Sequence, residues 1–269
     1  MHDHVRGHRP IERRINVRNE LAKYRRDPLF PFIYLLEGYH SIKVLEDQVS
    51  MYQLAYSWYF LSLERFLPEM SLAIRWSKGP YWALKEGRKF TAAERKLAGR
   101  YSSVARYLYL DYYNCLIYAR ILLDRVAGLS RLFLLRGNRP SFTSFADHKK
   151  FFKKQTSPYG EHEAYATYIR QNTDWFETPL KEVRDKFIVH ASPRHMRNSG
   201  YPQGDSELSL VIILPDDPKG AKPLSNVRAI FVSIPKLAQD MHGFLTWFNE
   251  YAVARTKAKS GAGAPGENA

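Results

Sequence analysis

The chain has almost no cysteine, no long apolar run and a deficit of acidic residues. Its single cysteine, Cys115, cannot form a disulfide within the chain, so a disulfide-stabilised scaffold is excluded. No apolar stretch approaches the length that crosses a bilayer. The first residues are not followed by the apolar segment of a secretory signal. We therefore expect a soluble, cytoplasmic protein that does not bind membranes.

Several motifs of common enzymes are also missing. The sequence contains no glycine-rich phosphate loop, no spaced Cys/His zinc pattern and no serine elbow. The histidines near the start, His2, His4 and His8, could chelate a metal only loosely, because no second shell would hold them in place. We therefore predict neither a metal site nor a cofactor, and dinucleotide, zinc and serine-hydrolase chemistries lack support.

Positive charge is what the chain has in excess. Lysine and arginine number 41 against 27 acidic residues, and the net charge of +14 with a pI near 9.7 favours a polyanionic partner such as nucleic acid. Residues 1–30 are rich in arginine and form either a basic arm that contacts nucleic acid or a solvated, partly helical extension. Residues 31–255 are predicted to form one domain, and 256–269 a disordered tail.

Apolar residues recur mostly at helical spacing, which predicts a mainly α fold, an antiparallel helical bundle. The aromatic stretch at 50–78 suggests a core or subunit interface, and Pro68 is expected to kink or interrupt its helix. A capping-box sequence at Thr91 and Glu94 predicts the start of a helix that runs to about 135, with or without a break at Gly99. It should form the central strut of the bundle.

In the second half of the chain, the spacing of apolar residues is helical except for one strand-like region. Helices are predicted at 145–155 and 161–172, followed by the segment 180–191. Strand-like stretches at 208–214 and 227–234 then suggest a β-hairpin of about 208–234, inserted before a last helix at 235–254. The hairpin must pack on the helices to be stable.

The segment 180–191 carries the candidate site. Leu180, Val183 and Phe187 mark the buried face of a predicted α-helix, with Arg184 and His190 on its two edges, roughly 120° apart. A permanent cation and a group that titrates near neutrality, at the border of a buried surface, could bind a phosphodiester. Alternatively, they are an ordinary ion-pairing arginine and a histidine at a helix end.

Two stretches resemble a known family. The string Val183-Arg184-Asp185-Lys186-Phe187-Ile188-Val189-His190-Ala191 resembles the signature of the HEPN superfamily, in which four to six residues separate Arg from His and a polar residue follows the Arg. It is most similar to the branch of AbiU2-type abortive-infection proteins. A second similar stretch spans 111–125, and the order of helices is similar over about 50–254. The resemblance implies a HEPN-like bundle whose motif helices meet across a homodimer cleft.

The resemblance also implies a function and a role for each site residue. Many HEPN proteins are metal-independent ribonucleases, so His190 would transfer protons and Arg184 would stabilise charge on the phosphorus centre. By the same resemblance Asp185 would position or polarise its neighbours, and Lys186 would add phosphate affinity. The implied activity is an endoribonuclease that uses 2′-hydroxyl attack at a composite dimer site, a toxin or anti-phage abortive-infection effector with an antitoxin or other regulatory partner.

Alternatives stay open at three points. Arg120 either forms a structural ion pair with Asp124 or faces the Arg184/His190 site. Lys149 and Lys150 either bind RNA or belong to a solvated basic face. The whole chain could also be a catalytically silent HEPN-like dimer that binds RNA, a nucleotide or a protein partner, which the wide angle between Arg and His favours.

Overall fold

Two long antiparallel helices form the axis of the molecule. The computed structural model describes residues 16–37, 43–134, 142–153, 162–189, 197–203, 207–215 and 227–261. Helices α3 (Lys43–Lys78) and α5 (Ala92–Leu134) pack against each other along most of their length. Ring contacts mark successive levels of this pair: Trp58 with Tyr118 at 5.6 Å, Phe66 with Tyr112 at 5.9 Å, and Trp76 with Tyr101 at 4.5 Å.

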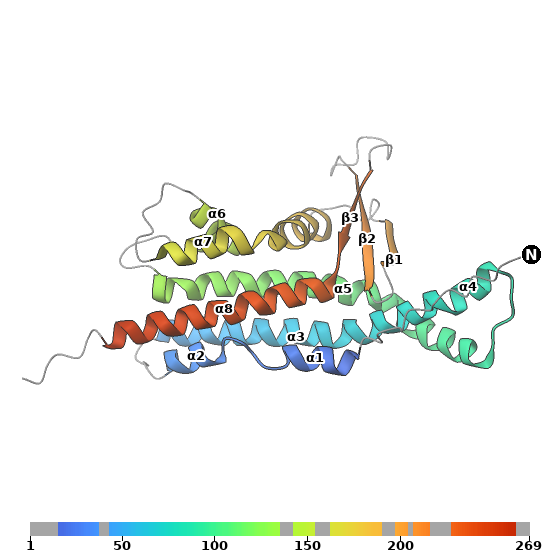
Figure 1. Ribbon diagram of the computed structural model, residues 1–269, viewed down its shortest axis with the longest axis horizontal. Helices are drawn as coiled ribbons and strands as arrows, with labels where there is room; N and C mark the ends of the chain where they lie inside the picture. The colour runs from blue at the N-terminus through green and yellow to red at the C-terminus, as the bar shows by residue number, and fades with distance from the viewer. Residues whose placement is uncertain are drawn as a thin grey trace, which may run out of the picture.

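The remaining helices cover this pair on different sides (Figure 1). Helix α1 (Val17–Tyr24) packs on α3, and α2 (Phe30–Glu37) packs on α8 (Ile234–Gly261), which also contacts α5. Helix α6 (Phe145–Lys153) contacts α5 and α7 (Glu163–Asn172), whereas the short α4 (Pro80–Lys85) lies at the far end of the arm that α3 and α5 form. The described part of the chain is thus mainly helical, as predicted.

Three strands precede α8. They are β1 (Arg197–Gln203), β2 (Glu207–Pro215) and β3 (Val227–Val232), and they pair antiparallel in the order β1-β2-β3. In the register of β2 and β3, Leu210 lies opposite Val232 and Ile213 opposite Ala229. The predicted segment at 208–234 contained two strands, and β1 was not predicted. Strand β2 contacts α3, so the sheet rests on the helical layer.

Helix boundaries follow the local sequence at several ends. The capping box before α5 is confirmed: the Thr91 backbone N–H donates to Glu94 Oε2 at 2.8 Å, and the Glu94 N–H donates to Thr91 Oγ1 at 3.2 Å. Helix α5 is continuous through Gly99. Helix α3 also continues through Pro68, so of the two expected effects, a kink or an interruption, the interruption is wrong. Helix α8 extends to Gly261, beyond the predicted end near 254 and into the predicted tail.

The core is an aromatic cluster between α2, α5, α7 and α8. Phe133 contacts the rings of Phe32, Phe248 and Tyr165 at 5.6, 5.3 and 6.1 Å, and all four residues are buried. The aromatic residues of α3 lie partly in the core and partly at the surface. Tyr52 and other residues on its inner face are buried, whereas Trp58 on its outer face remains 41% exposed. No described helix is both long and apolar enough to span a membrane.

Candidate functional site

The motif segment is a π-helix rather than the predicted α-helix. It spans Glu177–Val189 as η3 and follows a 3-10 turn, η2 (Asp174–Phe176). Leu180 and Val183 are fully buried, which confirms the predicted inner face. A π-helix bonds each residue to the fifth one along, so the angle predicted between Arg184 and His190, which assumed α-helical spacing, does not apply. His190 and the side chains of Asp185, Lys186 and Phe187 lie outside what the structure describes.

Arg184 lies on η3, which packs on the central helix α5. It is half-buried, and its positive charge acts on Asp124 of α5, whose side chain is 28% exposed. Burial raises the pKa of Asp124, whereas the Phe145 N–H, Arg120 and Arg184 oppose that rise. The Phe145 N–H donates to Asp124 Oδ1 at 2.7 Å, and Arg120 Nε lies 3.3 Å from the same oxygen. Because η3 contacts α5, the two stretches that resemble HEPN proteins lie on neighbouring helices.

Arg120 lies in the interior of the bundle. Only 6% of it is exposed, and its guanidinium carbon lies 4.7 Å from the ring centre of Phe176. Its Nη1 atom is buried without a hydrogen-bond partner among the described residues. The expected ion pair with Asp124 is present. Arg120 is too enclosed to contact RNA directly, so it can act on a bound RNA only through partners such as Asp124.

Lys149 has a different environment from the predicted one. It is 2% exposed, and its Nζ donates to the Thr173 carbonyl at 2.7 Å and lies 3.2 Å from Asp174 and 3.1 Å from Glu177. These contacts join α6 to the start of η3. Because the ammonium is enclosed and already neutralised, it offers no surface to a phosphate, and the predicted RNA contact of Lys149 is corrected. Lys150, its neighbour, is exposed.

Glu177 anchors the start of the motif helix. Burial raises its pKa, but hydrogen bonds from Lys181 and Lys149 outweigh this effect and lower the pKa to about 2. Lys181 Nζ lies 2.9 Å from Glu177 Oε2, and Lys153 Nζ lies 3.7 Å from Oε1. Three lysines thus hold one ionised carboxylate at the first turn of η3, where negative charge also favours the helix end.

Sequence analysis missed a buried histidine beside the site. His148 of α6 is 1% exposed and shares a hydrogen bond of 3.0 Å with the Tyr165 hydroxyl. Burial lowers its pKa to about 3, so the ring is neutral at physiological pH. The spacing of Phe145, His148 and Phe152 on one face of a short helix is the signal that could have found it. An enclosed, neutral imidazole has no access to a substrate.

Sequence analysis also missed a pair of carboxyl groups from different helices. Asp111 of α5 is 1% exposed, and its Oδ2 lies 3.1 Å from Arg65 Nη2 of α3. Burial, the charge of Asp111 and a hydrogen bond with it raise the pKa of Glu69 to about 7. Glu69 lines a groove of about 420 Å³ together with Arg75 and Arg100. No motif connects residues so far apart in the sequence.

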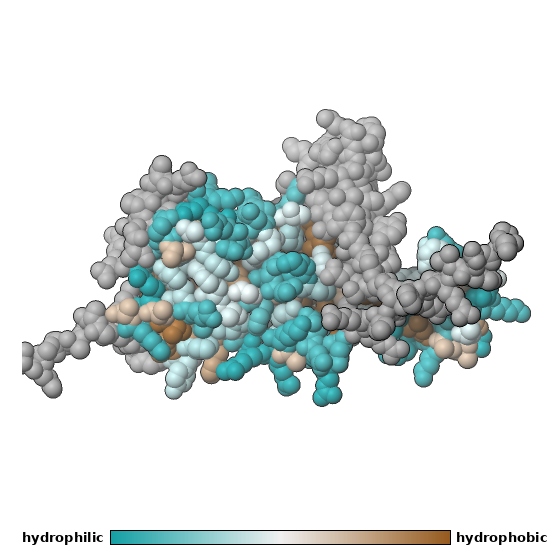
Figure 2. Space-filling view, in the orientation of Figure 1, coloured by the Kyte–Doolittle hydropathy of each residue, from teal (hydrophilic) through white to brown (hydrophobic). Residues whose placement is uncertain are grey.

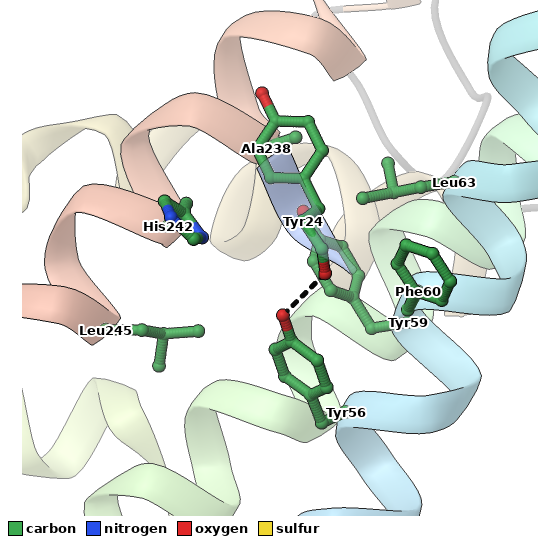
Figure 3. A pocket seen from close by; sticks show the side chains of 8 residues that line it. All are labelled: Tyr24, Tyr56, Tyr59, Phe60, Leu63, Ala238, His242 and Leu245. Carbon is green, nitrogen blue, oxygen red and sulfur yellow. Dashed lines mark hydrogen bonds between the residues drawn. The ribbon is translucent and has the colours of Figure 1, made fainter. Parts of the chain in front are cut away.

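The other cavity is too small for a ligand. It lies between α1, α3 and α8, has a volume of about 10 Å³ and is lined by Tyr24, Tyr59 and His242 among others (Figure 3). The hydroxyl of Tyr56 donates to the Tyr24 carbonyl at 2.8 Å beside it. Such a volume accommodates one water molecule. We therefore assign this cavity to packing.

The face of the molecule drawn in Figure 2 is hydrophilic over most of its described residues, with small separate apolar patches. Among the described residues, no cluster of three His, Cys, Asp or Glu side chains could hold a metal. Comparisons with protein-family models, with curated proteins and with solved structures find no match. What the fold and the site define is therefore a class: a helical bundle whose motif helix packs on a central helix that carries the Arg120–Asp124 pair.

Proposed function

We propose that the chain is a HEPN-like endoribonuclease that cleaves RNA without a metal, with Arg184 and His190 as its principal catalytic residues. The observation that carries the proposal is the packing of η3, which holds Arg184, on α5, which holds the Arg120–Asp124 pair. The resemblance rested on two stretches far apart in the sequence, and a shared site requires them to be neighbours. The contact between their helices supports the proposal.

The chemistry assigned to the motif uses charge and proton transfer. Arg184 stands half-buried at the edge of the core, where a guanidinium interacts more strongly with a phosphate than it does in open water. The negative charge of Asp124, which pairs with Arg120, would help to hold Arg184 in place. His190 would take the proton from the 2′-hydroxyl or return one to the leaving 5′-oxygen, Asp185 would orient its neighbours, and Lys186 and Lys150 would bind flanking phosphates.

One motif helix supplies one imidazole, whereas an in-line displacement uses a base and an acid on opposite sides of the phosphorus. The proposed site is therefore composite, with a motif helix from each of two copies of the chain. A HEPN-like bundle with its hairpin, a cytoplasmic location and a role as toxin or abortive-infection effector with a regulatory partner belong to the same proposal. The +14 charge supports RNA as the polyanion.

The test is a cleavage assay on mixed cellular RNA in excess chelator, with analysis of the 3′ ends. We expect the wild type to leave cyclic phosphate ends, and His190→Ala to lose cleavage by at least about 100-fold. His242→Ala is the matched control, because it removes a half-buried imidazole that lines the small cavity near α1. Undiminished cleavage by His190→Ala would contradict the assignment of His190 as a catalytic residue.

A catalytically silent dimer that binds RNA, a nucleotide or a protein is the second candidate. The specific observation in its favour is the burial of Arg120 and Lys149, which removes two of the cations expected to contact RNA. In the same assay this candidate gives no fragments with either protein. Salt-sensitive RNA binding would then be retained, since it depends on the remaining exposed cations.

A further inference from the structure

Helix α3 exposes a line of large apolar side chains. Met51 and Leu54 are each 42% exposed, Trp58 is 41% exposed and Leu61 is 52% exposed. Single exposed apolar residues are common on protein surfaces, but a contiguous line of them marks an interaction surface. The opposite face of α3 is already committed to the core, with Tyr52, Tyr59 and Leu63 buried, so this line is additional to what the fold needs.

The spacing of the line is that of a helix-pairing seam. The four residues are separated by three, four and three positions, the repeat in which two helices interdigitate side chains along a shared axis. At 3.6 residues per turn they fall within roughly 80° of the helix circumference. We call these four residues, with Asp47 and Arg65 at the two ends, the α3 seam.

The ends of the α3 seam carry opposite charges. Asp47 precedes Met51 by four positions and Arg65 follows Leu61 by four, so both continue the same repeat. Asp47 is exposed, and the Arg65 side chain is 53% exposed while it pairs with Asp111 at 3.1 Å. The α3 seam therefore has a negative end, an apolar middle and a positive end.

We propose that the α3 seam pairs with the α3 seam of a second copy of the chain, in antiparallel orientation. In one register Met51 then lies opposite Leu61, Leu54 opposite Trp58, and Asp47 opposite Arg65, and the same contacts repeat across the two-fold axis. A parallel two-fold pairing would place Asp47 against Asp47 and Arg65 against Arg65. Charge complementarity selects the antiparallel arrangement and a second copy as the occupant.

Helix α5 lies beside the seam. Tyr118 of α5 contacts Trp58 at 5.6 Å between ring centres, which brings α5 to the edge of the seam. A stable homodimer buries about 800 Å² on each partner, more than one line of side chains provides, so the interface would also include the part of α5 around Tyr118.

This inference goes beyond the proposed function and does not rest on it. Composite catalysis calls for the motif helices of two copies to meet, whereas the α3 seam follows from the exposure, spacing and charge of a different helix. Association is measured in the absence of RNA and also on His190→Ala, so a failure of pairing and a failure of catalysis are separate results.

The first experiment measures the mass of the full chain in solution by sedimentation equilibrium over a range of concentrations. We expect a dimer for the wild type, and for the double variant Leu54→Glu, Trp58→Glu a dissociation constant raised at least about 100-fold, because two charges would be buried in the seam. Leu84→Glu is the matched control: Leu84 is 60% exposed on α4, outside the seam, and its substitution leaves the dimer unchanged. Circular dichroism and thermal melting verify that each variant is folded.

A second variant tests the orientation. Asp47→Asn removes the attraction to Arg65 of the other copy, so an antiparallel dimer weakens about fivefold and loses part of its salt dependence. In a parallel dimer the same change relieves a repulsion and strengthens pairing. A wild type that stays monomeric, a dimer that survives the double variant, or a dimer that Asp47→Asn strengthens would each overturn the proposal.

Discussion

At the scale of single residues, Asp124 is the centre of the candidate site. It accepts a hydrogen bond from Phe145, pairs with the buried Arg120 and lies within the electrostatic reach of Arg184. Asp124→Asn would leave the buried guanidinium of Arg120 without the carboxylate that lies 3.3 Å from it. We expect a loss of about 3 kcal/mol in the free energy of unfolding, measured by urea denaturation.

The control for this prediction is Glu86→Gln. Glu86 lies 3.9 Å from Arg88, and both side chains are exposed at the surface, where an ion pair contributes little to the free energy of unfolding. Equal losses for the two variants would show that Asp124 is not the internal anchor described above. A large loss for Asp124→Asn alone supports its positioning role for Arg184.

Glu69 makes stability depend on pH. Its pKa rises from 4.5 to about 7 in the folded chain, so the folded state holds a proton that the unfolded state releases above pH 4.5. The contribution of Glu69 is therefore fully present below pH 4.5 and is lost as pH rises to 7. Glu69→Gln should remove this part of the pH dependence, as measured by urea denaturation at a series of pH values. Parallel pH profiles for both proteins would contradict the assignment.

At the scale of elements, α5 is the strut on which the bundle depends, and its first turn is closed by a reciprocal cap. Thr91 and Glu94 exchange hydrogen bonds of 2.8 and 3.2 Å. Thr91→Ala should cost about 1 kcal/mol in the free energy of unfolding, because one helix N–H loses its acceptor. Thr246→Ala, in the interior of α8, removes a hydroxyl that bonds only to the His242 carbonyl and should change stability less.

Features that a few adjacent residues determine could be predicted from the sequence, whereas features that depend on tertiary packing could not. The cap of α5 and the buried face at Leu180 and Val183 follow from a few adjacent residues. Pro68 in contrast remains within α3, because packing of the long helix on α5 outweighs one missing hydrogen bond. The π-helical form of η3 has no such local signature, since its apolar spacing matched an α-helix equally well.

The same division applies to the candidate site. Arg184 was found from its motif, but the pairing of Glu69 with Asp111 joins two helices across more than forty residues of sequence. Burial was the hardest property to predict. Lys149 and Lys150 are neighbours in one basic segment, and only the fold places the first in the core and leaves the second in solvent.

At the scale of the whole molecule, the net charge of +14 is useful to an RNA-binding protein only where the cations are exposed. Lys149 and Lys150 allow this to be tested within one helix turn. Because each phosphate contact on single-stranded RNA contributes about 0.7 to the slope of log affinity against log salt, Lys150→Ala should reduce the magnitude of that slope by about this amount while stability stays unchanged.

Lys149→Ala should instead lower the free energy of unfolding, because it leaves Glu177 and Asp174 without their buried partner. Filter binding across a salt series and urea denaturation measure the two effects. If Lys150→Ala leaves the slope unaltered, this face of α6 does not contact RNA, and the phosphate contacts belong to the motif helix and the other exposed cations.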